Sequence, residues 1–542
     1  MLILIRFRDW LRPSVLWSGI LLLAILGCRA EANAQAVEGA TGSAGKNRIL
    51  LVLPFDNGTG QPSLEWIREA APEILDARFG SAGFAPMRRE DRIYALDHLG
   101  LPQQFQPSRA SALKLAQTLD VDSIIVGSYR MEGTAIVAEA RVLNVPHLRM
   151  SDAVMARGEM RDLIAIFDSL AWRLTRIMDP GFSVAQETFL AAGAGLRLDA
   201  FEQYIRGISE PDQQERVRHL KQAVALSPNF SPAWMALGRE DFSGQQYEEA
   251  ASAFAKVSPN DPDDLEAGYY RGLSLLYSGS YKQAENSFAE VARELPLGEV
   301  LNNEGVAISR QDHDGTGLFV QAAAADPNNA DYHFNLAVSL KRHGSDASAL
   351  NELNQCLKIR PSDTEAQQVL AGWKGPKSTD PDEAGEALER IVRTFDAVAF
   401  KQAAAVMDQM ESTRLAALTP HDRAVKLAAR AKDYFNRGLL LEAERLFQEA
   451  EANDNSLAEA HLGLAMVRER TGDQNAARKE ANEALRLSPS AEAFMVLGRL
   501  DMAANHMDEA SRDVGEALKI DPGSTAAKEL NREIEARSGK KP

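Results

Sequence analysis

Cysteine is nearly absent from this chain. Its 542 residues include only Cys28 and Cys356. At most one disulfide can therefore form within the chain, and none if Cys28 is removed or modified. We expect the protein to be stabilised by packing rather than by covalent cross-links.

Blocks of positive charge are also missing. The chain has 60 Lys and Arg against 77 Asp and Glu, for a formal net charge of −17. Nucleic-acid phosphates select proteins with clustered Lys and Arg. The sequence therefore predicts no nucleic-acid partner.

Catalytic signatures are absent as well. The nine histidines are scattered, and neither His-Glu-x-x-His nor Gly-x-Ser-x-Gly occurs. The stretch Asp312-His313-Asp314-Gly315 has metal-ligand residue types, but it falls at an expected turn with no further ligand set at metal spacing. A carboxylate pair brought together by folding stays open. The sequence favours a non-enzymatic protein with no cofactor and no metal.

Long apolar runs are limited to one near the N-terminus. The run Val15–Gly27 follows three arginines and precedes the small-residue stretch Ala32-Asn33-Ala34, an order typical of a signal peptide. We predict a signal peptide at residues 1–34 and a linker at 35–45. The run is short for a membrane span of about 20 apolar residues, so an uncleaved anchor is the lesser alternative.

The same region contains a second cleavage signal. Ile25-Leu26-Gly27-Cys28 resembles a bacterial lipobox, in which lipidation of Cys28 would attach the protein to a membrane. Both cleavage sites stay open. The prediction common to both is export, to the periplasm or as a lipoprotein on the envelope membrane.

A pattern of small and aromatic residues recurs about every 34 residues in the second half. Trp234 and Gly238 are followed by Ala250, Phe254 and Pro262, which resembles the tetratricopeptide repeat. The resemblance implies helical hairpins, with small residues where two helices cross, an aromatic beside the crossing and a proline at the end. Further copies include Gly272, Ala284, Phe288 and Pro296; Ala337, Ala349, Leu353, Cys356 and Pro361; Ala431, Tyr434, Ala443, Phe447 and Ala450; Ala465, Ala477, Ala484 and Pro489; Gly498, Ala510, Ala517 and Pro522; and weaker ones at 197–228 and 298–327.

The repeats imply an all-α helical-hairpin solenoid that proline and glycine interrupt once. Cys356 takes an alanine position of the repeat, so we expect a packed side chain rather than a reactive thiol. The stretch 384–420 looks helical but departs from the consensus, and Ser524–Arg537 is predicted to be a polar capping helix. The predicted parts are a first array at 190–373, a linker at 374–385 and a second array at 386–537.

Residues 46–180 have a different pattern, which predicts an α/β domain ahead of the repeats. Apolar runs of strand length alternate with amphipathic stretches of helix length. Met131-Glu132-Gly133 supplies the turn of a hairpin. The predicted strands are 49–53, 123–129 and 135–143, and the predicted helices are 64–79, 108–119 and 161–178.

Three stretches of this domain resemble the TolB amino-terminal-type domain: Leu53–Ile67, Asp120–Val145 and Arg161–Leu174. The domain is also similar to the CsgG and penicillin-binding-protein-activator lipoproteins. The resemblance implies the order β-α-β-α-β-β-β-α and a role in assembly or interaction in the cell envelope. It implies no catalytic residues.

Gly58 and Gly60 follow the first predicted strand and raise the question of a phosphate-binding loop. A Rossmann loop needs a third glycine, and a P-loop needs Gly-Lys-Ser/Thr at the helix start; the chain has neither here. Asn57 favours a turn, and Ser63 is predicted to cap the helix Leu64–Phe79. We predict a structural turn. A sensor that binds a small molecule or nucleotide on this domain is the alternative.

Stacked helical hairpins form an extended groove lined by the first helix of each repeat, so we predict a scaffold or adaptor that binds other proteins or peptides there. The expected lining is apolar and aromatic. The alternative is that half of these side chains are buried between neighbouring repeats instead of lining the groove. It lacks the paired Lys and Asn of repeats that clamp a C-terminal carboxylate, which favours an apolar helical or extended peptide. The predicted groove residues are Met235, Arg239, Phe242, Tyr269, Leu273, Tyr277, Phe334, Val338, Lys341, Phe435, Met466, Met495 and Met502.

Overall fold

The computed structural model describes residues 49–101, 109–193, 195–374, 387–395 and 410–538. They divide into two compact units. Unit 1 holds the described residues up to Leu198 and those from 410 onward, and unit 2 holds the described residues from Asp199 to 395. The predicted signal peptide with Cys28, the linker at 35–45 and nearly all of the linker at 374–385 lie outside the described residues. Within the described ranges, no helix combines the length and the apolar character needed to cross a membrane.

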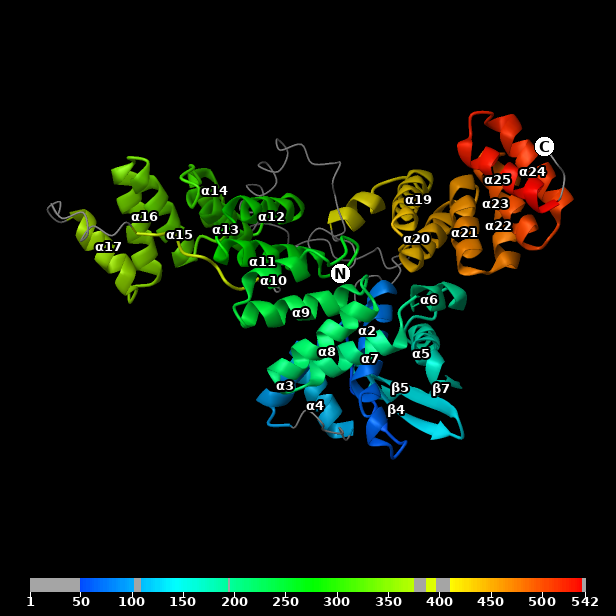
Figure 1. Cartoon of the computed structure of the whole chain (residues 1–542), viewed down its shortest axis with the longest axis horizontal. Helices are drawn as coiled ribbons and strands as arrows, with labels where there is room; N and C mark the ends of the chain where they lie inside the picture. The colour runs from blue at the N-terminus through cyan, green and yellow to red at the C-terminus, as the bar shows by residue number, and fades with distance from the viewer. Residues whose placement is uncertain (1–48, 102–108, 194, 375–386, 396–409, 539–542) are drawn as a thin grey trace, which may run out of the picture. The chain divides into compact units, whose positions relative to one another are not determined.

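Unit 1 begins with a mixed seven-stranded sheet (Figure 1). Its path is β3-β1-β4-β5-β6, with β2 paired to β4 and β7 paired to β5. β1 runs parallel to β3 and β4, whereas β4 and β5 form an antiparallel hairpin that turns at Gly133, where φ is 66°. The strands are β1 (Ile49–Val52), β2 (Asp56–Asn57), β3 (Ala85–Pro86), β4 (Ser123–Glu132), β5 (Ala135–Asn144), β6 (Arg149–Met150) and β7 (Val154–Glu159).

Helices pack on this sheet and bury its apolar side chains. The helix α5 contacts β5, β7 and α2, and α4 contacts β4. Phe55 and Phe167 meet edge to face with their ring centroids 5.5 Å apart. A Cβ atom at Gly127 would lie 2.2 Å from the Phe55 ring, so only glycine permits this packing. The helices are α2 (Ile67–Ser81), α3 (Arg89–His98), α4 (Arg109–Leu119), α5 (Leu163–Met178) and α6 (Gln186–Gly193).

The repeats of unit 2 are helical hairpins packed in chain order. Gly238, Gly272 and Gly305 lie where two helices cross, and a Cβ at these positions would lie 2.7, 2.7 and 2.9 Å from the facing phenylalanine ring. This close approach is why the pattern pairs glycine with phenylalanine. The helices are α7 (Leu198–Ser209), α8 (Gln213–Leu226), α9 (Ser231–Ser243), α10 (Tyr247–Phe254), α11 (Asp264–Tyr277), α12 (Tyr281–Glu294), α13 (Gly298–Ser309), α14 (Thr316–Ala325), α15 (Ala330–Arg342), α16 (Asp346–Ile359) and α17 (Thr364–Lys374).

The second set of hairpins belongs to unit 1, together with the sheet. Glu444 on α20 accepts hydrogen bonds from the Thr188 hydroxyl and, at 3.2 Å, from the Ala185 amide. Ser183 Oγ donates to Gln448 Oε1 at 2.7 Å, so α6 and its preceding loop pack directly on this block. The helices are α19 (Pro420–Asn436), α20 (Leu440–Asn453), α21 (Ala458–Thr471), α22 (Gln474–Leu487), α23 (Ala491–Ala503), α24 (Met507–Ile520) and α25 (Thr525–Ser538).

One helix prediction is wrong over the first of its two described parts, whereas residues 410–416 of the same stretch are helical as predicted. Residues 387–395, within the stretch 384–420 predicted to be helical, have no helical structure. Their main-chain groups instead bond to side chains of unit 2, and these bonds take the place of helical ones. This segment therefore belongs structurally with the first set of repeats and not with the second.

Candidate functional site: an extended segment on the first repeats

Residues 387–395, the bound segment, lie across the first helices of three successive hairpins in unit 2. Arg390 contacts α15, Val392 contacts α13 and α11, and Thr394 contacts α11. The segment therefore runs opposite to the order of the repeats. We call the face that contacts it the recognition face: Tyr269, Asn302, Asn303, Arg310, Asp331, Phe334, Asn335, Arg342, Asp363 and Glu365.

Two asparagines hold the main chain of Arg390. Asn335 accepts the Arg390 amide at 2.6 Å through Oδ1 and donates to its carbonyl oxygen at 2.7 Å through Nδ2. Asn302 donates to the same carbonyl at 3.1 Å, and its Oδ1 accepts a hydrogen bond from Asn335 at 2.7 Å. Both side chains are fully buried. A buried amide without partners costs about 1–3 kcal/mol, so these positions require a main chain opposite them.

Asn303 and Tyr269 hold the main chain two residues farther on. Asn303 accepts the Val392 amide at 2.9 Å and donates to its carbonyl oxygen at 2.7 Å. The Tyr269 hydroxyl donates to the same carbonyl at 2.7 Å and lies 3.3 Å from the Thr394 carbonyl. Alternate residues, Arg390 and Val392, present their main chain to the helices, which is the arrangement expected of an extended chain. Main-chain recognition of this kind places no demand on side-chain identity.

Glu389 is the most buried side chain of the segment. Its carboxylate has 0% exposed surface and forms ion pairs with Arg310 at 2.9 Å and with Arg342. Arg310 also donates to the main-chain carbonyl of Glu389 at 3.1 Å. Two guanidinium groups from successive hairpins thus converge on one carboxylate, which is the charge-assisted arrangement that defines a glutamate-specific position.

The Arg390 side chain enters a pocket of carboxylates. Its guanidinium forms ion pairs with Asp331 at 2.8 Å, Asp363 at 2.7 Å and Glu365 at 2.8 Å. Its Cζ lies 3.7 Å from the centroid of the Phe334 ring, a cation–π contact. Hydrogen bonds from Arg390 hold the pKa of Asp363 below its usual value. The recognition face therefore offers adjacent sites of opposite charge.

Apolar side chains complete the contact. Ile391, Val392 and Phe395 pack against the hydrophobic core formed by the neighbouring hairpins. The Phe395 ring lies 5.4 Å from the ring of Tyr269, and the guanidinium of Arg393 lies 5.5 Å from the ring of Tyr277. Arg393 and Thr394 are otherwise exposed.

The structure brings three of the predicted groove residues together at the segment: Tyr269, Tyr277 and Phe334. Three others are buried among the helices instead of lining an open surface. The remaining three of unit 2 engage neighbours in their own block: Arg239 pairs with Glu266 at 2.6 Å, Phe242 packs on Tyr277, and Lys341 pairs with Asp346 at 2.9 Å. The three buried residues are Met235, Leu273 and Val338.

The predicted groove residues of the second block pack against three separate apolar clusters. Phe435 packs beside the cluster of α19 and α20 and lies under the guanidinium of Arg470, 5.6 Å from it. Met466 packs beside a cluster that includes Leu497. Met495 and Met502 both pack beside a third cluster in α23–α25.

The residues that hold the segment were not predicted, although the sequence contains a signal for them. Asn303 is followed seven positions later by Arg310, and Asn335 by Arg342. Residues seven apart lie on one face of a helix, and the two pairs recur at nearly the repeat period. The pattern was missed because the repeat at 298–327 is weak in its packing residues.

The turn after β2 is ordered by Asn57, the last residue of that strand. The Asn57 side chain donates to the Gln61 carbonyl at 3.2 Å and to Glu65 at 2.8 Å, and it accepts the Thr59 amide at 3.0 Å. The predicted cap at Ser63 is wrong, because the chain first makes a 3-10 turn at Pro62–Leu64 and α2 begins only at Ile67.

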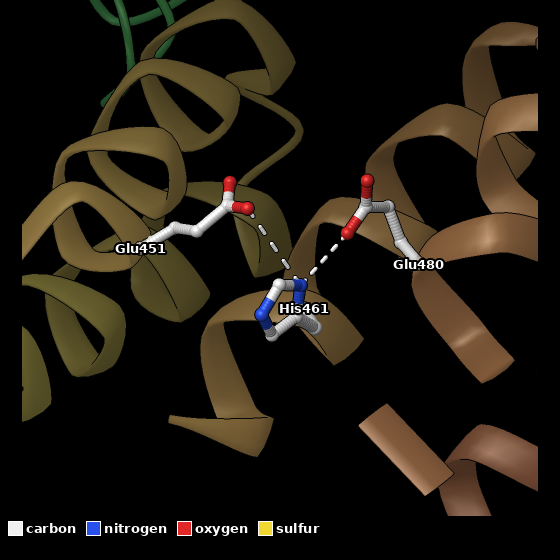
Figure 2. Close-up of side chains that lie close together, drawn as sticks. All are labelled: Glu451, His461 and Glu480. Carbon is white, nitrogen blue, oxygen red and sulfur yellow. Dashed lines mark hydrogen bonds and ion pairs between the residues drawn. The ribbon is translucent and has the colours of Figure 1, made fainter. Parts of the chain in front are cut away.

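Figure 2 shows the one cluster of metal-ligand residue types found among the described residues: Glu451, His461 and Glu480. His461 Nδ1 lies 2.8 Å from Glu480 and 3.9 Å from Glu451, and Nε2 lies 3.0 Å from the Asn455 carbonyl. A carbonyl and a carboxylate only accept hydrogen bonds, so a protonated imidazole satisfies both nitrogens.

The same geometry recurs in unit 2, which explains the cluster. His333 Nδ1 lies 2.7 Å from Glu352, and its Nε2 lies 3.1 Å from the Pro327 carbonyl, six residues earlier in the chain. At the corresponding place in another repeat, Trp234 donates its ring N–H to the Pro228 carbonyl at 2.8 Å. At this repeat position a ring N–H donates a hydrogen bond to a carbonyl of the preceding turn and so stabilises that turn. We assign His461 this structural role rather than a role in binding a metal.

Cys356 and the stretch Asp312-His313-Asp314-Gly315 have structural roles as well. Cys356 is fully buried, and burial together with the nearby charge of Asp363 raises the pKa of its thiol to about 11. Asp312 to Gly315 form the turn between α13 and α14, where Asp314 accepts the Thr316 amide at 2.9 Å.

Comparison with known proteins identifies the repeats. A family model described as tetratricopeptide repeat matches residues 235–299 and 428–492, one stretch in each block. The hairpins in these two stretches therefore match the tetratricopeptide repeat. No curated protein matches the chain.

Several solved structures resemble parts of it. YrrB, described as a TPR protein with an unusual peptide-binding site, is 18% identical and covers 32% of this chain and 91% of its own, with a TM-score of 0.29. MamA from Desulfovibrio magneticus RS-1 is 19% identical over 34% of this chain and 99% of its own, with a TM-score of 0.27. The LpoB C-terminal domain from Salmonella enterica is 17% identical over 23% of this chain and 87% of its own, with a TM-score of 0.19. None of these likenesses carries a functional conclusion.

Proposed function

We propose that this tetratricopeptide-repeat protein is an exported, non-enzymatic scaffold whose recognition face binds extended segments of partner proteins. Tetratricopeptide repeats generally mediate binding between proteins. The proposal rests on two pairs of hydrogen bonds. Asn335 bonds both the amide and the carbonyl of Arg390, and Asn303 bonds both groups of Val392. Such contacts accept any extended main chain, and the adjoining charged and aromatic sites select among sequences.

The test uses the chain with residues 387–395 replaced by a Gly-Ser sequence of the same length. A labelled peptide of the native segment, Ala-Leu-Glu-Arg-Ile-Val-Arg-Thr-Phe, is added and its fluorescence polarisation is measured. We expect saturable binding that the double change Asn303→Ala/Asn335→Ala weakens by at least about tenfold, since four hydrogen bonds are lost. A peptide that does not bind the replaced chain, while its circular dichroism stays helical, contradicts the proposal.

The sheet domain would act in envelope assembly or regulation beside the scaffold. The support is that the loop and helix α6 directly after the sheet domain pack on the second set of hairpins through Glu444 and Gln448, and that both parts lie in one unit. The export signal and Cys28 support a location in the periplasm or on the envelope membrane.

A further inference from the structure

We propose that the bound segment, residues 387–395, is an internal ligand that occupies the recognition face in place of a partner, and that the partner carries the pattern Glu-Arg-aliphatic-aliphatic-x-x-aromatic in an extended segment. The inference rests on the proposed function and specifies its ligand. The sequence pattern follows from the side chains of the bound segment that are enclosed by the repeats and those that are exposed.

The glutamate position is enclosed by charge. Glu389 is fully buried between Arg310 and Arg342, whose side chains are only 19% and 27% exposed. A neutral residue at this position would remove the carboxylate with which both partly buried guanidinium groups pair. Breaking a buried ion pair by removing one partner is strongly unfavourable, so a carboxylate is required here.

The arginine position is enclosed by shape as well as charge. The flat guanidinium of Arg390 stacks on Phe334 and meets Asp331 and Asp363 at its edge. A lysine presents a single ammonium point and cannot reproduce this combination of stacking and forked hydrogen bonding. The pocket therefore selects arginine.

The other positions separate into apolar and open ones. The aliphatic pair Ile391 and Val392 and the aromatic Phe395 face the core of the repeats. Leu388 is 57% exposed, and Arg393 and Thr394 are exposed. The chain continues on both sides of the segment, so recognition requires no terminal carboxylate.

The segment is exchangeable in principle because it joins no helix or sheet of the fold. Its main-chain bonds end on side chains of the recognition face, which another extended peptide can satisfy equally. A segment in the same chain acts at a high effective concentration. A partner can bind only the molecules whose recognition face is open, so its apparent affinity is reduced in proportion to that fraction. The segment is therefore autoinhibitory.

The experiment compares the unaltered mature chain with the chain whose residues 387–395 are replaced by Gly-Ser, using the labelled native peptide as probe. We expect the replaced chain to bind at least about tenfold more tightly than the unaltered chain. A peptide with Glu389→Gln should bind the replaced chain at least about tenfold more weakly. The control peptide with Leu388→Ala should bind like the native one, because this side chain is exposed.

Equal binding to the two chains overturns the internal-ligand proposal and leaves the proposed function intact, whereas no binding to either chain overturns both. Equal affinity for the Glu389→Gln peptide overturns the sequence pattern. A dimer of the unaltered chain in sedimentation, lost on replacement, shows that the face takes a second copy and also overturns the proposal. If the replaced chain loses helical content, the double variant Glu389→Gln/Arg390→Gln takes its place with the same readings.

Discussion

The Asn303 side chain forms hydrogen bonds with both main-chain polar groups of Val392: it donates to the carbonyl oxygen at 2.7 Å and accepts a hydrogen bond from the amide at 2.9 Å. The two residues are 89 positions apart in sequence. A carboxamide matches the donor and acceptor of an extended main chain, so one buried side chain replaces the pairing that a neighbouring strand would give.

The first prediction concerns this contact. Asn303→Ala should raise the hydrogen-exchange rate of the Val392 amide by at least about tenfold, because the bond to Oδ1 is lost and the segment opens more often. The measurement is exchange mass spectrometry on peptides that cover 387–395. The control is Asn354→Ala on the exposed face of α16, whose amide donates to the carbonyl of Leu350 in its own helix. If both variants leave exchange unchanged, Asn303 does not hold the segment.

The second prediction separates binding from folding at Tyr269, which is fully buried. Tyr269→Phe should keep the unfolding transition within about 1 kcal/mol while weakening peptide binding to the replaced chain, because only the hydroxyl is lost. Tyr269→Ala should cost about 3–5 kcal/mol through a core cavity. Urea unfolding and polarisation measure the two effects.

Replacing Tyr269, Tyr277 and Phe334 together by alanine should for the same reason unfold the first repeats, not merely abolish binding. Circular dichroism reports this as a loss of helical signal. Retention of full helical content in the triple variant would show that these rings are dispensable to the core.

The third prediction concerns Gly193 at the end of α6. A Cβ there would lie 2.2 Å from Asp168 Oδ2 and 2.9 Å from Arg78 Nη2, where Arg78 Nε donates to the buried Asp168 carboxylate at 2.7 Å. Gly193→Ala should destabilise unit 1 by about 1–3 kcal/mol through overpacking. Chemical unfolding checks this. The matched control is Gly515→Ala inside α24, which meets nothing within 4 Å and should be neutral or stabilising by up to about 1 kcal/mol.

The fourth prediction is a pH dependence at His461. Burial lowers the pKa of this imidazole, but the hydrogen bonds to Glu480 and to the Asn455 carbonyl, with the charge of Glu451, outweigh burial and raise it. A histidine whose folded pKa is raised stabilises the fold fully below its unfolded pKa of about 6.5, and this contribution is lost as pH rises through the folded pKa. The cationic side chains of Arg468 and Lys479 also approach Glu480, at 3.8 and 3.9 Å.

His461→Gln should therefore remove part of the fall in melting temperature between weakly acidic and weakly alkaline pH. The control is His506→Gln, a side chain that is 63% exposed. Zinc should not change the melting temperature of the unaltered chain. A saturable rise with zinc would contradict the structural role assigned to the cluster.

The fifth prediction concerns export. Expressed with its own N-terminus in a Gram-negative host, the chain should leave the cytoplasm and be shortened by roughly 27 to 34 residues. Cys28→Ala should block processing and membrane association if the lipobox is used. Unchanged size and solubility of that variant would exclude lipidation and favour cleavage after Ala34.

Local signals in the sequence were sufficient to predict the repeats. Gly272 and Phe288 lie within one hairpin, and a Cβ at the glycine would come 2.7 Å from that ring, so their spacing directly records a contact between adjacent helices. The hairpin at Gly133 is local in the same sense. Its two strands follow each other in the chain, and the glycine between them has a positive φ.

The tertiary structure alone decided the recognition face. Tyr269 and Val392 are 123 positions apart, and Asn335 and Arg390 are 55 apart, so no local pattern records that they meet. Residues 387–395 looked helical because helix propensity is a local property, and their hydrogen-bond partners lie on three other hairpins. The amino-acid sequence by itself determined the helical repeats. Only the folded array, by placing buried amides that need partners, determined that this segment is extended and bound.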